Sequence, residues 1–372
     1  MKTLYRYLLR QVLAGTLGAT GVLVFVLVTA NFLRDGIELL NNREVSLWVV
    51  LQLIGYLVPF VLTFALPWGL LVAVLLVFGR LAQNRELLAL HANGISLASI
   101  VAPILWMALA LSFFSFWINA FLGPRSRHAF KELFADTIIS HPICLFQSQR
   151  AVDQFQGFRI FVGGRRDTEL QDVHLWQIDE GYRPVRCVRA RKAQILQDLK
   201  HHRLVLTLYK ARQEERTGWG PNAEVQETSG GRADELPLEI SLIPLIERMG
   251  TPRSTGGSTL AEIAKDLLDR SSILHRSNPT PVLTEIQKRL AFSFSCFTFA
   301  LVGIPIALWT RRGETSLNLA LSLAIVLAYY LVILAGDALK ARTTLFPELI
   351  VWFPNFAFQL AGCAFLWKAS RL

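Results

Sequence analysis

Long apolar segments alternate with short polar ones along this chain. Six segments are apolar enough, over the roughly 20 residues that a helix needs to cross a bilayer, to be membrane spans. They cover residues 12–33, 47–79, 97–122, 290–310, 317–336 and 349–367. The second is longer than a bilayer requires and contains Pro59 and Pro67. Because proline removes a backbone donor, we expect this helix to kink or tilt.

The pattern changes after Gly123-Pro124, where charged and turn-forming residues become frequent. Short strands are predicted at residues 158–162, 173–178, 193–196 and 204–209. Turns are predicted at Gly163-Gly164 and at residues 179–181. Strands at this spacing are typical of a β-sandwich or jellyroll. A linker follows at 249–258, and then an amphipathic helix that begins with a capping-box sequence at 259–262.

The sequence therefore predicts an α-helical integral membrane protein with six transmembrane helices and an inserted β-jellyroll domain. Helices one to three occupy residues 1–122 and include a short cytoplasmic helix at about 80–96. The β domain occupies 123–257. An amphipathic helix and connector occupy 258–287, and helices four to six occupy 288–372.

Six spans put both termini on the same side of the membrane. Basic residues in short loops favour the cytoplasmic side, whereas long domains cross regardless of charge. The arrangement with more cytoplasmic cations places inside Lys2, Arg6, Arg10, Arg80, Arg85, Arg311, Arg312, Lys368 and Arg371. It leaves outside only Arg34, Arg43, Lys340 and Arg342 in the short loops. We therefore expect cytoplasmic termini and an exoplasmic β domain.

Composition supports the membrane interpretation. The chain is 52% hydrophobic and 18% charged, against about 25% charged residues in soluble domains. The net charge of +10 is compatible with nucleic-acid binding, but a basic excess beside membrane spans more often sets topology. No nucleic-acid partner is expected. Cys144 and Cys187 would lie outside, where they could form a disulfide or remain small buried side chains.

The interiors of the spans contain no Asp, Glu, Lys, Arg or His. Ion-coupled transporters usually keep such groups near the bilayer midplane, so an ion-coupled flippase is disfavoured. No GxSxG or P-loop sequence occurs, so we expect no catalytic residue and no cofactor, and any ATP hydrolysis in another subunit.

An apolar bundle with ionic groups at its faces suits a lipid as cargo. Arg34, Lys288 and Arg289 fall at the outer rim, where they could meet phosphates or only anchor the helices. An aromatic stripe with helical spacing lies on the second span and consists of Tyr56, Phe60 and Phe64. Ordinary packing explains such a stripe more often than a ligand does.

The link between the second and third spans, residues 80–96, predicts a short helix across the membrane face with Gly94 as its stop. Leu81, Leu87 and Leu90 would bury apolar surface, while Arg85 and Glu86 would face outward. A solvated charged loop is the alternative.

With these segments the chain resembles the LptF/LptG (YjgP/YjgQ) family of lipopolysaccharide export permeases. The resemblance covers nearly the whole chain. It is carried by the stretches Arg6-Tyr7-Leu8-Leu9-Arg10, residues 86–96, residues 285–291, Gly303-Ile304-Pro305, Arg311-Arg312-Gly313, Tyr329-Tyr330 and Trp352-Phe353-Pro354-Asn355. Residues 213–231 match poorly, and the resemblance does not separate the LptF from the LptG branch.

The resemblance implies an inner-membrane permease of a bacterium with two membranes, with a periplasmic jellyroll. Such a permease pairs with a second LptF/LptG-type permease and with the cytoplasmic ATPase LptB. Lipopolysaccharide would enter a cavity between the permeases, and ATP-driven closure would move it into the jellyroll. It would continue along an LptA-type jellyroll bridge, with an LptC-type single-span regulator at the gate.

The resemblance also implies roles for particular residues. Residues 80–96 match the coupling helix of the family, and Glu86 would face the ATPase groove. The coupling set is then Arg80, Arg85, Glu86, Leu87, Leu90 and His91. Arg34 would meet the lipid head group, although Asp35 follows it. The alternatives are a non-transporting scaffold that docks periplasmic jellyroll proteins and an exporter of a different lipid.

Overall fold

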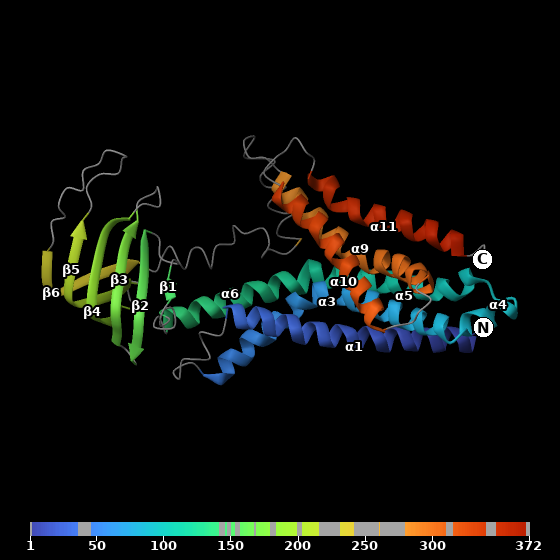
Figure 1. Cartoon of the computed structure of the whole chain (residues 1–372), viewed down its shortest axis with the longest axis horizontal. Helices are drawn as coiled ribbons and strands as arrows, with labels where there is room; N and C mark the ends of the chain where they lie inside the picture. Colours follow the sequence, from blue (N-terminus) through green and yellow to red (C-terminus); the bar gives the residue numbers. More distant parts are fainter. Residues whose placement is uncertain are drawn as a thin grey trace. The chain divides into compact units, whose positions relative to one another are not determined.

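The structure is a computed structural model and describes most of the chain. The described residues are 2–35, 46–140, 146, 150–152, 157–166, 169–178, 184–198, 203–215, 231–241, 260, 280–309, 315–339 and 347–369. The chain divides into two compact units (Figure 1). A helical unit comprises Met1–Asn31, Ile54–His128 and Pro252–Leu372, and a unit that contains the sheet comprises Phe32–Leu53 and Ala129–Thr251.

Six helices are long and apolar enough to cross a membrane, and each overlaps one predicted span. Five of these spans are the single helices α1 (Lys2–Asp35), α3 (Leu47–Gln83), α9 (Thr280–Trp309), α10 (Thr315–Ala338) and α11 (Pro347–Ala369). The remaining span joins α5 (Leu97–Trp117) to α6 (Gly123–Ser140). The predicted helical membrane protein with an inserted β domain is thus confirmed. Pro59 and Pro67 both lie inside α3, which continues through them.

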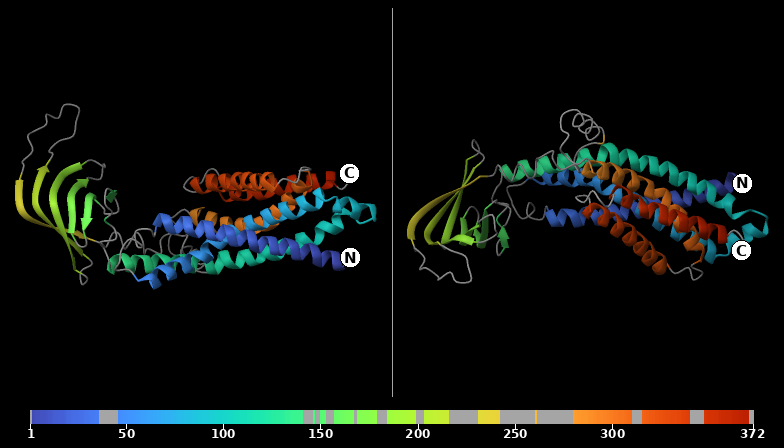
Figure 2. Two further views of the ribbon diagram at one scale, coloured as in Figure 1. Left: turned by 60° about the horizontal axis from the view of Figure 1, so that its bottom comes forward. Right: turned by 90° about the horizontal axis from the view of Figure 1, so that it is seen from above.

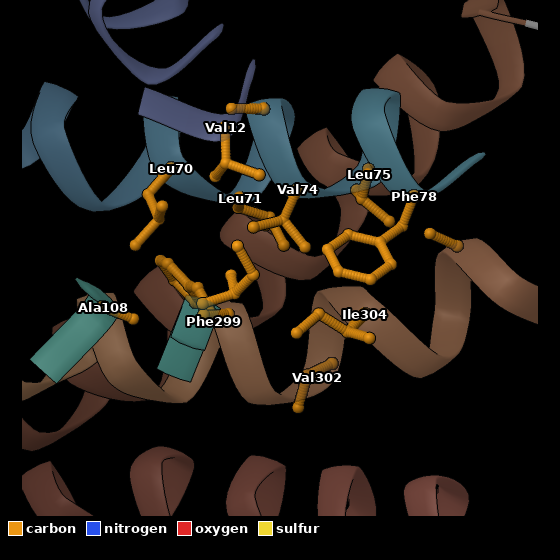
Figure 3. Packing of buried hydrophobic residues seen from close by; sticks show 14 of the residues in the cluster. Val12, Leu70, Leu71, Val74, Leu75, Phe78, Ala108, Phe299, Val302 and Ile304 are labelled. Carbon is orange, nitrogen blue, oxygen red and sulfur yellow. The ribbon is translucent and has the colours of Figure 1, made fainter. Parts of the chain in front are cut away.

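The helical core is centred on α3 and α9. Leu71, Val74 and Phe78 of α3 pack toward Phe299 and Ile304 of α9, and all five side chains are buried (Figure 3). The outer helices α1, α10 and α11 bury much less of their surface and expose large apolar side chains such as Leu360, which is 73% exposed. Apolar side chains all around a helix are typical of a membrane environment.

The third span does not end at Leu122 as predicted. A π-helical turn, η1 (Ile118–Leu122), joins α5 to α6, and the helix continues through Gly123 and Pro124 to Ser140. Proline has no N–H to donate and its ring crowds the preceding turn. The wider π turn lies directly before Pro124 and gives that crowded turn more room, so the helix continues.

The described strands form one antiparallel sheet in sequence order (Figure 2). They are β1 (Arg150–Val152), β2 (Phe158–Arg166), β3 (Glu169–Ile178), β4 (Pro184–Asp198), β5 (Arg203–Glu215) and β6 (Gly231–Ser241). Each of the four predicted strands lies inside a longer one. Alternate residues such as Val173, Leu175 and Leu206 are fully buried, together with Phe146.

The predicted turn at Gly163-Gly164 is wrong, because both glycines lie within β2. Gly164 pairs with Gln171 of β3. Asp172, the residue after Gln171, has a left-handed backbone with φ of 51°. A Cβ at Gly163 would lie only 3.0 Å from the Cβ of Asp172, so glycine here makes room for that irregularity.

Several predicted segments lie outside the described residues. They include the turn at 179–181, the linker at 249–258 and, except for Leu260, the amphipathic helix before residue 280. Residues 280–287, predicted as connector, form the first turns of α9. Cys144 is also outside, so a disulfide with Cys187 stays a prediction.

Candidate functional site

A cavity of about 220 Å³ lies in the helical unit, among α3, η1, α6, α9 and α10. Aromatic rings form its apolar wall. Phe64 of α3 packs edge-on against Phe60 at 5.4 Å and against Phe292 of α9 at 5.2 Å, measured between ring centroids. Tyr330 of α10 lies 5.3 Å from Phe292. Edge-to-face rings of this kind form a rigid apolar surface.

Ionic groups of α9 and α10 form the opposite side of the cavity. Lys288 Nζ lies 2.6 Å from Glu285 Oε2 and 3.1 Å from Asp337 Oδ1, and Arg289 Nε lies 3.2 Å from Glu285 Oε1. Arg289 is only 7% exposed. Charges within a membrane span are costly unless they are paired, and here two cations are balanced by two carboxylates.

Arg127 is the third cation of the cavity. Its guanidinium lies 4.9 Å from the centroid of the Phe60 ring, in a cation–π arrangement. Within the described part of the chain, no carboxylate forms an ion pair with Arg127. Its side chain is exposed, so its hydrogen-bond donors are available to a ligand.

Asn119 supplies a neutral polar group. It lies in η1, and its amide Nδ2 donates to the Ser115 carbonyl oxygen at 3.2 Å and to the Ser293 hydroxyl at 3.3 Å. These contacts connect η1 to α5 and α9. The cavity therefore joins an apolar aromatic wall to a polar and charged rim, which is the surface that an amphipathic molecule requires.

Four of the six predicted lipid-binding residues come together in this cavity, namely Phe60, Phe64, Lys288 and Arg289. Tyr56 is not part of it. The side chain of Arg34 is outside the described residues, so its role stays a prediction. Sequence reasoning missed Arg127 because it ended the third span at Leu122. It also did not predict Asp337 of α10, which pairs with Lys288 in the cavity.

The predicted short helix between the second and third spans is present as α4 (Glu86–Ala92). It follows Arg85, whose φ is 56°, and ends before Gly94, whose φ is +77°. The amide N–H groups of Gly94 and Ile95 donate to the carbonyl oxygens of His91 and Leu90. Gly94 thus stops the helix, as predicted.

The two faces of α4 differ. Leu81 at the end of α3 is buried, and Leu87 and Leu90 pack against the helical core. Arg80 and Arg85 are exposed, and so is Leu88, at 68%. The exposed side of α4 thus presents one large apolar side chain, Leu88, next to two cations.

Two polar side chains of α4 lie between those faces. Glu86 is half-buried and accepts a hydrogen bond of 3.1 Å from the amide of Asn84. The Nδ1 atom of His91 is buried without a hydrogen-bond partner among the described residues. His91 as a whole is half-buried, so this nitrogen lies on the packed side of α4 while part of the ring is accessible.

By its fold, the protein is a multi-pass helical membrane protein with six candidate spans and an inserted antiparallel β domain. The sequence profile described as lipopolysaccharide export system permease LptF/LptG matches residues 6–368. The chain therefore belongs to the LptF/LptG family of lipopolysaccharide export permeases.

Individual relatives agree with the family assignment. The chain is similar to the lipopolysaccharide export system permease protein LptF of Escherichia coli strain K12, of Escherichia coli O157:H7 and of Shigella flexneri. Each is 21% identical over 367 residues, which covers 97% of this chain and 94% of the relative.

Proposed function

We propose that this chain is the permease subunit of an ATP-driven exporter that extracts lipopolysaccharide from the inner membrane and passes it toward the outer membrane. The supporting observation is the cavity in which the Phe60, Phe64 and Phe292 rings meet the cations Arg127 and Lys288. Its partners would be a second LptF/LptG-type permease, LptB, an LptC-type regulator and an LptA-type bridge.

In this proposal the cavity holds the junction between the acyl chains and the phosphorylated head group. The aromatic wall excludes water from the apolar part of the lipid. Lys288 already has two carboxylate partners, so its charge is balanced. Arg127 presents a planar guanidinium that can bind a phosphate through two parallel hydrogen bonds. Arg127 is therefore the proposed head-group contact in this cavity.

We place the coupling to ATP hydrolysis at α4. Leu87 and Leu90 anchor the helix to the core, so a push on its exposed side is transmitted to α3 and α5. Glu86, Arg85 and Leu88 supply charge and apolar area for a groove of the ATPase. ATP and Mg²⁺ would be bound by the partner and not by this chain.

Photo-crosslinking in cells tests the head-group contact. Arg127→Gln removes the guanidinium, and Arg125→Gln removes an equally exposed cation of the same helix that does not line the cavity. With a photoreactive residue at Phe60, we expect lipopolysaccharide adducts to fall about tenfold or more in Arg127→Gln and to remain in Arg125→Gln.

Equal adduct yields in both variants would contradict the role of Arg127. A chain that carries the photoreactive residue at Phe60 and the native Arg127 could also form no lipid adduct while its periplasmic partners are still recovered. That result would instead support the scaffold alternative. Adducts with another phospholipid alone would show an exporter of a different lipid.

A further inference from the structure

Strands β4, β5 and β6 bring three arginines into one row. Arg189 pairs with Arg212, and Arg212 pairs with Arg232, directly across neighbouring strands. All three are exposed. Side chains directly opposite each other in a sheet have Cβ atoms about 5 Å apart, and like charges there destabilise the pairing. The three arginines thus concentrate positive charge on one exposed face of the sheet.

Two residues along from the arginine row, the strands depart from regular pairing from β2 to β6. Among the described strands, Gly163 and Asp172 do not form a regular pair, and neither do Asp172 and Arg191. The same holds for Arg191 with Lys210 and for Lys210 with Asp234, although residues on both sides of them are paired. Asp172 and Lys210 have left-handed backbones, with φ of 51° and 52°, a conformation that is rare for a long side chain such as lysine. The irregularities thus form one continuous crease, from β2 to β6.

The arginine row and the crease line one hollow of about 590 Å³. Its charged residues are Arg189, Arg191, Lys210, Arg212, Arg232, Asp172 and Asp234. Five cations thus face two carboxylates. The remaining lining residues are Ala190, Ala211 and Ala233. Ala190 and Ala211 are buried in the core of the sheet, so no bulky uncharged side chain occupies the hollow.

One wall of this hollow is held in place by His174. Arg189 Nε donates to His174 Nδ1 at 3.3 Å, so the ring proton is on Nε2, which lies 3.2 Å from Asp172 Oδ1 and donates to it. The imidazole ring also packs edge-on against Phe161, with the centroids 5.9 Å apart. The side chains of Arg189 and Asp172 are therefore positioned before any ligand arrives.

We propose that this hollow binds phosphoryl groups, through guanidinium forks from β4, β5 and β6. Arginine binds phosphate in bidentate geometry, and several arginines on adjacent strands surround a polyvalent phosphate better than a single exposed cation. A bound anion would also remove the repulsion within the row. The proposal does not rest on the transport function, since phosphate binding is measured without transport.

Inorganic pyrophosphate is the probe. Its binding to the full-length chain in a neutral detergent is measured by titration calorimetry at fixed ionic strength. The test variant is Arg212→Gln with Arg232→Gln. The matched control is Arg159→Gln with Lys192→Gln, which removes two exposed cations of the same sheet that lie outside the hollow.

We expect the test variant to bind pyrophosphate at least about tenfold more weakly than the control, because it loses two charge-assisted partners. Arg212→Lys with Arg232→Lys keeps the charge but not the fork, and should lose part of the affinity. Lys210→Gln leaves all four arginines of the hollow unchanged, including the three of the row, and should weaken binding even if the double variants fold poorly. Equal affinity of test and control variants would overturn the proposal.

A second titration distinguishes the source of the phosphate. Lipid A in nanodiscs that displaces pyrophosphate would identify a lipid head group, and no displacement would identify a soluble phosphate. The test variant could instead lose an acidic protein partner while it binds pyrophosphate unchanged. That result would show that the arginine row contacts a protein, and it would overturn the proposal.

Discussion

At the scale of single residues, the stretches that carry the family resemblance contact one another. Asn355 is fully buried, and its Nδ2 donates to the Ala291 carbonyl oxygen at 2.9 Å. Its Oδ1 accepts from the hydroxyls of Thr298 at 2.9 Å and Tyr329 at 3.3 Å. Trp352 Nε1 donates to Gln287 at 2.8 Å. Three separate motifs are thus explained by one network that joins α9, α10 and α11.

Replacing Asn355 should therefore destabilise the helical unit. Asn355→Ala removes the buried hydrogen bonds to Thr298, Tyr329 and Ala291, and each such bond contributes about 0.5–1.5 kcal/mol. Thermal unfolding in detergent measures this as a lower midpoint. Leu360→Ala, at an exposed position of the same helix, is the control and should change the midpoint little. A similar loss in both variants would rule out the network as the cause.

The ion pairs of the cavity allow a second test at this scale. Lys288→Met leaves the Glu285 and Asp337 carboxylates without a common cation, and breaking a partly buried pair costs about 3 kcal/mol or more. Adding Asp337→Asn removes the charge of the carboxylate that has lost Lys288 and should recover part of that loss. Folded yield by size-exclusion chromatography measures both variants. A double variant that is no better than Lys288→Met would show that the two residues are not coupled.

At the scale of elements, periodicity and length predict the six spans and four of the strands, because burial on a helix or strand repeats at a fixed interval. The same reasoning ends the third span at Leu122, where glycine, proline and charge coincide. The actual helix continues because η1 accommodates the proline, and such local geometry has no signature in the hydrophobic pattern. Arg127 was missed for this reason.

The short helix α4 carries a prediction of its own. Glu86→Lys reverses the charge on the proposed ATPase surface, so the permease should insert normally but retain less LptB when it is purified from membranes. Gln83→Lys adds one positive charge at an exposed site before the helix and is the control. If Glu86→Lys abolished export while LptB recruitment remained intact, the assignment of α4 as the ATPase contact would fail.

At the scale of the whole molecule, the sequence predicts the order of helices and β domain but not the cavity. Phe60, Phe64, Lys288 and Arg289 lie on segments more than 200 residues apart in the chain, and no periodicity indicates that they meet. The irregular row of the sheet was also not predicted, since left-handed backbones at Asp172 and Lys210 contradict local preference. Tertiary packing determines both features.

The orientation in the membrane is a prediction for the whole chain. In a background without the four native cysteines, Ala92→Cys tests the end of α4 and Lys192→Cys tests the sheet, both at exposed positions. A membrane-impermeant maleimide added from the periplasmic side should label Lys192→Cys and should label Ala92→Cys only after the inner membrane is opened. The reverse pattern would overturn the assignment of cytoplasmic termini.

The pairing of Lys288 and Arg289 with Glu285 has a consequence for biosynthesis. All three residues belong to α9, at spacings of three and four, so the helix carries its own counter-ion when it leaves the ribosome. It can enter the lipid phase with one of its two positive charges neutralised before α10, which supplies Asp337, has been synthesised. The ionic side of the cavity is thus partly assembled during translation, and the later helix adds only the last carboxylate.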